Sequence, residues 1–172
     1  MQHRHPIETF TAQGPQLKSG GVLKADVIVA ATGLQLNVLG DVKLSLGGVP
    51  VNPADLLVYK GMMFSGPPNL ANTFGYSNAS WTLKADLTAR YFCRLLRHMD
   101  RSGNTVFTPK RDADVAPEPF LDFTSGYVQR AAALLPKQGN RKPWRLYQNY
   151  LLDLLTLRWG PVADGVMRFT RR

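Results

Sequence analysis

Two short runs in the first half of the chain predict strands. Residues Leu23–Ala31 (LKADVIVAA) are a near-continuous series of small and β-branched apolar side chains, followed directly by Thr32 and Gly33. The run is too short for a helix and is typical of a strand buried on both faces. A second short strand is predicted over Asn69–Phe74, where it ends at Gly75.

Between these runs the pattern alternates and predicts a β-hairpin. Apolar and polar residues alternate over Val42–Leu46, two glycines follow, and the apolar pattern resumes over Val49–Val51. Gly47 and Gly48 suit the positive φ angles of a tight hairpin turn. Pro50 has no N–H to donate, so the second strand is expected at an edge.

The longest helical pattern runs from about Asn78–Ser80 to Met99. Asn78 and Ser80 are competent N-caps, and Ser102-Gly103 marks the end. We expect Cys93, in the middle of this helix, to be a buried thiol. Lys84 and three arginines are expected to point away from the buried face. That face is defined by apolar residues at three-to-four spacing: Trp81, Ala85, Ala89, Phe92, Leu95 and Met99.

After this helix the pattern changes, which sets a boundary at residues 102 and 103. The stretch 103–119 is rich in Pro, Asp and Lys without periodicity, and predicts a long surface connection. Two further helices are predicted, over Ser125–Leu135 before Pro136 and over about Trp144–Arg158 before Gly160-Pro161. The chain is therefore expected to be an α/β protein with segments 1–102 and 103–172.

Composition changes this picture mainly by exclusion. The 172 residues, of which 44% are hydrophobic, suffice for one domain with a core. The single cysteine excludes an internal disulfide, and His3 and His5 lack further ligands nearby, so no metal site is predicted. No apolar stretch reaches the ~20 residues of a transmembrane helix, and the N-terminal residues lack an apolar signal core. We therefore expect a cytoplasmic protein with no transmembrane segment.

The formal net charge is +9, and most of the excess lies in residues 101–172, with twelve basic and six acidic side chains. These basic residues are scattered among prolines and aromatics and form no nucleic-acid motif, so no nucleic-acid partner is predicted. A solvated basic surface is the simpler interpretation. A basic face that meets phosphate is the alternative.

The junction between the second strand and the long helix carries the clearest chemistry. Gly75 is followed by a polar turn over Tyr76–Ser80 and then by the helix that opens at Trp81. A helix N-terminus presents unpaired N–H groups and a partial positive charge, which suits an anion or a carbonyl oxygen. A plain helix cap is the alternative interpretation.

The motifs over Gly75–Asp86 and Ala25–Leu34 resemble those of the class B flavoprotein monooxygenases, in particular the bacterial Baeyer–Villiger branch with the ethionamide-activating monooxygenases. The resemblance covers nearly the whole chain. Its most specific motif is Gly75–Asp86 (GYSNASWTLKAD). The other matching motifs are Ala25–Leu34, Tyr59–Gly61, Pro68–Leu70, Gly126–Val128, Leu135–Lys137, Lys142–Trp144 and Gln148–Tyr150.

This resemblance implies the fold of the C-terminal part of a flavoprotein with two dinucleotide-binding domains. Segment 1–102 would be the returning part of the FAD-binding domain, with short strands and a hairpin against a long helix, and 103–172 a helical C-terminal extension. The Gly-x-Gly-x-x-Gly loop, the Phe-x-Gly-x-x-x-His-x-x-x-Trp fingerprint and the second glycine loop of the family do not occur here. The resemblance therefore implies that the chain corresponds to only the C-terminal portion of such an enzyme, without its phosphate-binding loops.

The implied enzyme uses NADPH and FAD to oxidise a small-molecule ketone or a sulfur-containing substrate. The residues that match the cofactor-facing positions are Thr32, Gly33, Gly75, Asn78, Ala79 and Ser80, and no catalytic residue is assigned. Trp81 matches a wall of the substrate pocket, with core packing as the alternative.

The resemblance also bears on activity and partners. The isolated chain is expected to be inactive, and an upstream FAD/NADPH-domain polypeptide is a candidate partner. The alternative function is a small basic α/β module that binds a protein or a polyanion without catalysis.

Overall fold

The computed structural model describes residues 6–31, 33, 36–37, 39–40, 42–120 and 126–171. It divides into two units, Met1–Leu34 and Gln35–Arg172. Within these described residues, both α-helices and strands are present, and every sheet is a two-stranded antiparallel pair. The predicted α/β composition is confirmed at this level, with short strand pairs and one long helix.

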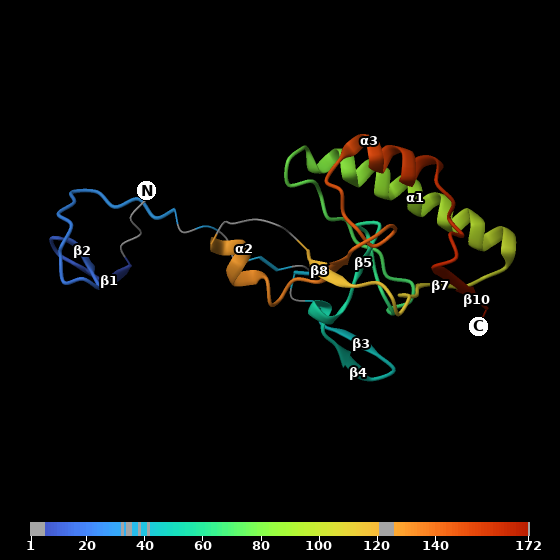
Figure 1. Ribbon diagram of the computed structural model, residues 1–172, viewed down its shortest axis with the longest axis horizontal. Helices are drawn as coiled ribbons and strands as arrows, with labels where there is room; N and C mark the ends of the chain where they lie inside the picture. The colour runs from blue at the N-terminus through green and yellow to red at the C-terminus, as the bar shows by residue number, and fades with distance from the viewer. Residues whose placement is uncertain are drawn as a thin grey trace. The chain divides into compact units, whose positions relative to one another are not determined.

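The first unit contains one hairpin, drawn in blue in Figure 1, formed by β1 (Ile7–Thr11) and β2 (Gly14–Leu17). Gly14 has a φ of 132°, and a Cβ there would collide with the carbonyl oxygen of Leu23. Glycine is therefore the residue that this turn requires. The sequence analysis did not predict this hairpin.

The predicted strand Leu23–Ala31 is wrong. The amides of Leu23 and Ala25 donate to the carbonyls of Pro15 and Gln13, but the segment forms no ladder with any described strand. Val27 is 78% exposed and Val29 is 83% exposed. The apolar run records a preference for burial, but a strand also needs neighbours to pair with, and the described residues provide none.

The second predicted strand, Asn69–Phe74, is also wrong, because only Ala71 forms an isolated bridge, with Met63. The described residues of the second unit form four antiparallel strand pairs. They are β3 (Leu44–Leu46) with β4 (Val49–Val51), β5 (Val58–Tyr59) with β6 (Met63–Phe64), β7 (Val106–Pro109) with β10 (Met167–Thr170), and β8 (Pro117–Pro119) with β9 (Lys137–Gly139).

The β3–β4 hairpin confirms its prediction. Leu46 pairs with Val49, and Gly47 and Gly48 have φ angles of 59° and 84°. Two consecutive positive φ angles give the turn whose twist matches that of the strands. Pro50 stands in a two-stranded sheet, where each strand is an edge. The short 3₁₀ turn η1 (Pro53–Asp55) follows, capped by the side chain of Asn52.

The long helix α1 (Trp81–Ser102) confirms the predicted helix and its end, because Gly103 adopts a φ of 65° as the C-cap. Its buried face is rotated from the predicted one, since Trp81 and Ala89 are exposed and Cys93 is exposed as well. The residues that α1 buries are Lys84, Leu87, Thr88, Tyr91, Leu95 and Met99.

The remaining helices are shorter than predicted. Helix α2 spans Gly126–Ala131, and α3 (Tyr150–Asp153) continues into a π-helical turn, η2 (Leu154–Trp159), which Gly160 ends. Asn149 caps α3 through a bond from the Leu152 amide, so the helix begins six residues later than Trp144. In Figure 1, α3 and η2 lie alongside α1, in agreement with their contacts.

The expected surface connection over 103–119 instead carries β7 and buries Phe107 and Val115. These residues join a core cluster that includes Tyr59, Tyr91 and Trp144, each 0% exposed. The strand β10 pairs with β7, the strand that follows α1 in the chain. Helix α3 and η2 pack on α1, and β9 contacts β5.

Candidate functional site

The residues that precede α1 form a close-packed junction. A Cβ at Gly75 would collide with the ring of Trp81, so only glycine permits the backbone to approach the ring this closely. Phe74 contacts the same ring, with centroids 5.4 Å apart. Trp81 is nonetheless 56% exposed, which means that one side packs on the junction while the rest stays open.

The first turn of α1 has no side-chain cap. Ser80 occupies the N-cap position, but its hydroxyl bonds with the Thr82 hydroxyl at 2.7 Å instead of with a backbone amide. The first turn also contains no acidic residue. Ala79 and Ser80 are exposed, so this end of the helix offers its N–H groups and the positive end of its dipole to a ligand.

Gln148 makes three hydrogen bonds with the turn before the helix. Its side-chain oxygen accepts from the Ser77 amide at 3.1 Å and from the Ser77 hydroxyl at 3.2 Å. Its backbone carbonyl accepts from the Asn78 side chain at 3.1 Å. The shape of the junction thus depends on a residue about 70 positions further along the chain.

The structure brings together five of the residues that the sequence singled out: Gly75, Asn78, Ala79, Ser80 and Trp81. Gly33 lies in the other unit, where it is exposed and has a φ of 87°. Thr32 lies outside the described residues. The structure therefore gathers the junction but does not test a role for Thr32 and Gly33.

Below the junction lies an ionic network that the sequence analysis missed. Lys84, buried in α1, donates to Asp153 Oδ2 at 2.7 Å, and the Tyr76 hydroxyl donates to the same oxygen at 2.7 Å. Burial, and then the hydrogen bond to Asp153, raises the pKa of Tyr76. The available signal was helical spacing, because Lys84 stands seven residues before Tyr91 on the buried stripe.

A second network of the same composition joins the β5–β6 turn to the loop before β10. Lys60 Nζ lies 3.0 Å from Asp164 Oδ2, and the Tyr59 hydroxyl donates to that oxygen at 2.7 Å. Burial acts to raise the pKa of Asp164, but the hydrogen bond from Tyr59 and the Lys60 ammonium outweigh it and hold that pKa below its ordinary value. Burial, and then the neighbouring Tyr91, raises the pKa of Tyr59.

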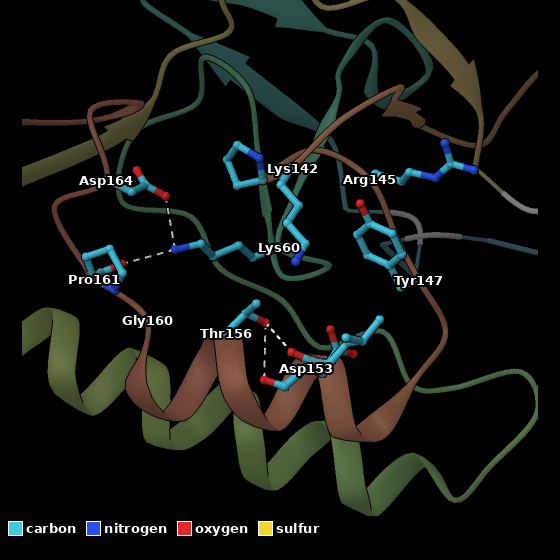
Figure 2. Close-up of a pocket in the computed structure, with 11 residues that line it drawn as sticks. Lys60, Lys142, Arg145, Tyr147, Asp153, Thr156, Gly160, Pro161 and Asp164 are labelled. Carbon is cyan, nitrogen blue, oxygen red and sulfur yellow. Dashed lines mark hydrogen bonds and ion pairs between the residues drawn. The ribbon is translucent and has the colours of Figure 1, made fainter.

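A pocket of about 250 Å³ lies between the two networks. Figure 2 shows Lys60 near its centre, Asp164 and Pro161 on one side, and Arg145 and Tyr147 on the other. Thr156 and Asp153 reach it from the helix below. The pocket therefore combines paired charges with an aromatic wall.

The two tyrosines make an alkaline prediction. A phenol whose pKa is raised in the folded state stabilises the fold fully below the unfolded value of about 10, and this stability is lost as the pH rises above it. We expect Tyr59 and Tyr76 to remain protonated until the chain unfolds, which phenolate absorbance and circular dichroism recorded over the same pH series would show. The Tyr59→Phe variant should show the same rise in phenolate absorbance before unfolding, because Tyr59 does not contribute to that rise. Ionisation of all six tyrosines before any loss of dichroism would contradict the prediction.

Comparison with known proteins finds relatives that are named as FAD-containing monooxygenases. The chain is 50% identical over 167 residues, 96% of its length, to the FAD-containing monooxygenase EthA of Mycobacterium tuberculosis (strain ATCC 25618 / H37Rv). It is 46% identical over 166 residues to the EthA of Mycolicibacterium smegmatis, also across 96% of its length. These matches confirm the resemblance to flavoprotein monooxygenases that the motifs indicated.

A further relative is a protein of Acinetobacter sp named "Probable FAD-binding monooxygenase AlmA", 44% identical over 168 residues, or 96% of this chain. In all three cases the chain spans 34% of the relative, so it corresponds to about a third of the length of these proteins. No family model matches the chain. No solved structure matches it either. Among the described residues, no helix is both long and apolar enough to cross a membrane.

Proposed function

We propose that this chain is the C-terminal portion of an FAD- and NADPH-dependent monooxygenase that oxidises ketones in a Baeyer–Villiger reaction or oxidises sulfur compounds. The observation that carries the proposal is the match of 96% of the chain to proteins named as FAD-containing monooxygenases, about a third of whose length it spans. On this proposal the isolated chain is inactive, because the glycine loops that hold the dinucleotide phosphates do not occur in it.

The residues of the junction fit a flavin. The uncapped first turn of α1 supplies N–H donors and a positive dipole end, which suit the electron-rich pyrimidine edge of the ring. Gly75, Asn78, Ala79 and Ser80 would hold that edge. FAD, when bound, supplies the electron transfer to oxygen, and NADPH supplies the electrons. The part of this chain is to bind and orient the ring and to favour the negative charge that develops on it.

Several finer assignments belong to the same proposal. Segment 1–102 would be the returning part of the FAD-binding domain, with Thr32 and Gly33 in a turn beside the cofactor, and 103–172 the C-terminal extension. Trp81, with its open side, would form a wall of the substrate pocket. An upstream polypeptide carrying the FAD and NADPH domains would complete the enzyme, which we place in the cytoplasm.

The Ala79→Pro substitution tests the junction. Proline removes one N–H donor at the point of contact and is compatible with the start of a helix, so the fold should change little. In an assembly with an upstream FAD-domain polypeptide, we expect flavin affinity to fall about two- to fivefold and the flavin reduction potential to become more negative. Fluorescence titration with FAD and a spectroelectrochemical titration measure the two quantities.

Ala79→Ser, which keeps the amide, is the matched control and should leave both values at those of the parent. Equal values for the proline variant in a folded assembly would reduce the junction to a plain helix cap. A separate measurement addresses the proposed enzyme as a whole. NADPH-dependent oxygen uptake by the pure 172-residue chain would contradict the view that it is only one portion of the enzyme.

A further inference from the structure

The pocket between the two ionic networks has walls from separate parts of the second unit. Lys60 comes from the β5–β6 turn, and Leu152 and Thr156 come from α3 and η2. The segment before α3 contributes Lys142, Pro143, Arg145 and Tyr147. A volume of about 250 Å³ holds roughly eight water molecules at liquid density, or one small ring with a substituent. The pocket is therefore sized for a small ligand.

Both carboxylates at the pocket are already neutralised from within the protein. Asp153 accepts from Lys84 and Tyr76, and Asp164 accepts from Lys60 and Tyr59. Lys60 Nζ also donates to the Tyr91 hydroxyl and to the Pro161 carbonyl, each at 3.2 Å, so its three protons all have partners. These side chains add no net charge to the pocket.

Two cations on the opposite wall remain uncompensated. Lys142 Nζ lies 5.3 Å from the centroid of the Tyr147 ring, and Arg145 Cζ lies 5.9 Å from it. In the part of the chain that the structure describes, neither has an acidic side chain within ion-pair distance. In Figure 2, the Lys142 side chain ends between Lys60 and Tyr147, while the Arg145 side chain extends away from Lys142 on the other side of Tyr147. This wall therefore carries two positive charges beside an aromatic face.

The other surfaces of the pocket are apolar. Leu152, Pro143 and Pro161 line it, and Leu152 and the Tyr147 ring are still 37% and 40% exposed. Burial of such surfaces under a ligand is favourable by about 25 cal/mol per Å². A ligand that complements both the cationic wall and the apolar surfaces has an anionic group and a compact apolar body.

We propose that this pocket binds a small organic anion, with a carboxylate set against Lys142 and a ring or short apolar group packed against Tyr147 and Leu152, while Arg145 adds positive charge at the edge of the site. The charges of Asp153 and Asp164, each held by its own lysine, leave the carboxylate free of strong repulsion.

Benzoate is the probe that tests the site, with benzamide as its uncharged isostere and inorganic phosphate as an anion without an apolar body. Calorimetric titration of the 172-residue chain should give tighter binding of benzoate than of either of the other two. Binding should weaken as ionic strength rises. The Tyr147 ring resonances should shift with benzoate. If benzamide or phosphate binds as well as benzoate, the proposal is overturned.

Lys142→Gln should lower benzoate affinity about three- to tenfold, because it removes the charge and keeps most of the side chain. Arg145→Gln should have a smaller effect, since that side chain lies at the edge of the site. The matched control is Arg97→Gln, an exposed cation of α1 that does not line the pocket. All three residues are polar and at the surface, so circular dichroism should show an unchanged fold. Equal benzoate affinity in the Lys142 variant and the Arg97 control would also overturn the proposal.

Discussion

Replacement of Trp144 by alanine is expected to lower the free energy of unfolding by about 3 to 5 kcal/mol. The side chain is 0% exposed and packs edge-on against Tyr59, with ring centroids 5.6 Å apart. A Cβ at Gly139 would collide with Trp144 Cβ, so the backbone of β9 is also fitted to this residue. Among the residues that the structure describes, the indole N–H has no hydrogen-bond partner, which places the expected loss near the lower end of this range.

Chemical denaturation followed by circular dichroism measures this loss. Trp159→Ala is the matched control, because Trp159 is 62% exposed at the end of η2 and its removal should cost less than about 0.5 kcal/mol. The comparison holds the residue type constant and varies only burial. Similar losses in the two variants would mean that Trp144 does not belong to the core.

Asp153→Ala is expected to destabilise the fold by a similar amount, about 3 to 5 kcal/mol. The substitution leaves the Lys84 ammonium, whose side chain is 6% exposed, without its counter-charge, and leaves the Tyr76 hydroxyl without its acceptor. A buried charge that loses its partner costs far more than the net contribution of the pair. Urea denaturation at neutral pH measures the effect.

Two further variants separate charge burial from mere loss of a contact. Asp86→Ala breaks the exposed pair with Arg90, in which both side chains are more than half exposed, and should cost under about 1 kcal/mol. Combining Asp153→Ala with Lys84→Met should recover much of the stability, because no uncompensated charge then remains. If the single Asp153 variant were no less stable than the Asp86 variant, Lys84 would not be a buried cation.

Local rules were sufficient for the elements that depend only on nearby residues. Helix α1 and its glycine cap follow from periodicity and from the φ angle at Gly103, and the β3–β4 hairpin follows from Gly47 and Gly48. The strands over Leu23–Ala31 and Asn69–Phe74 failed because strand formation requires a pairing partner, which composition does not reveal. The face of α1 was misplaced because Lys84 was assigned to solvent by its charge.

The candidate site divides in the same way. The junction from Gly75 to Trp81 could be located from its motif, since its residues are contiguous. The ionic networks could not, because Lys84 and Asp153 are 69 positions apart, and Tyr59 and Asp164 are 105 positions apart. Which aspartate meets which lysine is decided by the packing of residues 142–164 against the β5–β6 turn and α1. No local pattern encodes that pairing.

The dependence of the junction on Gln148 and Asp153 has a consequence for the order of events during synthesis on the ribosome. The turn Tyr76–Asn78 is translated about 70 residues before the groups that hold it. Until Asp153 has emerged, the Tyr76 hydroxyl and the Lys84 ammonium lack their native acceptor, and they favour contact with water. The native contacts of Tyr76 and Lys84 at the N-terminal end of α1 therefore form only after residue 153 has emerged.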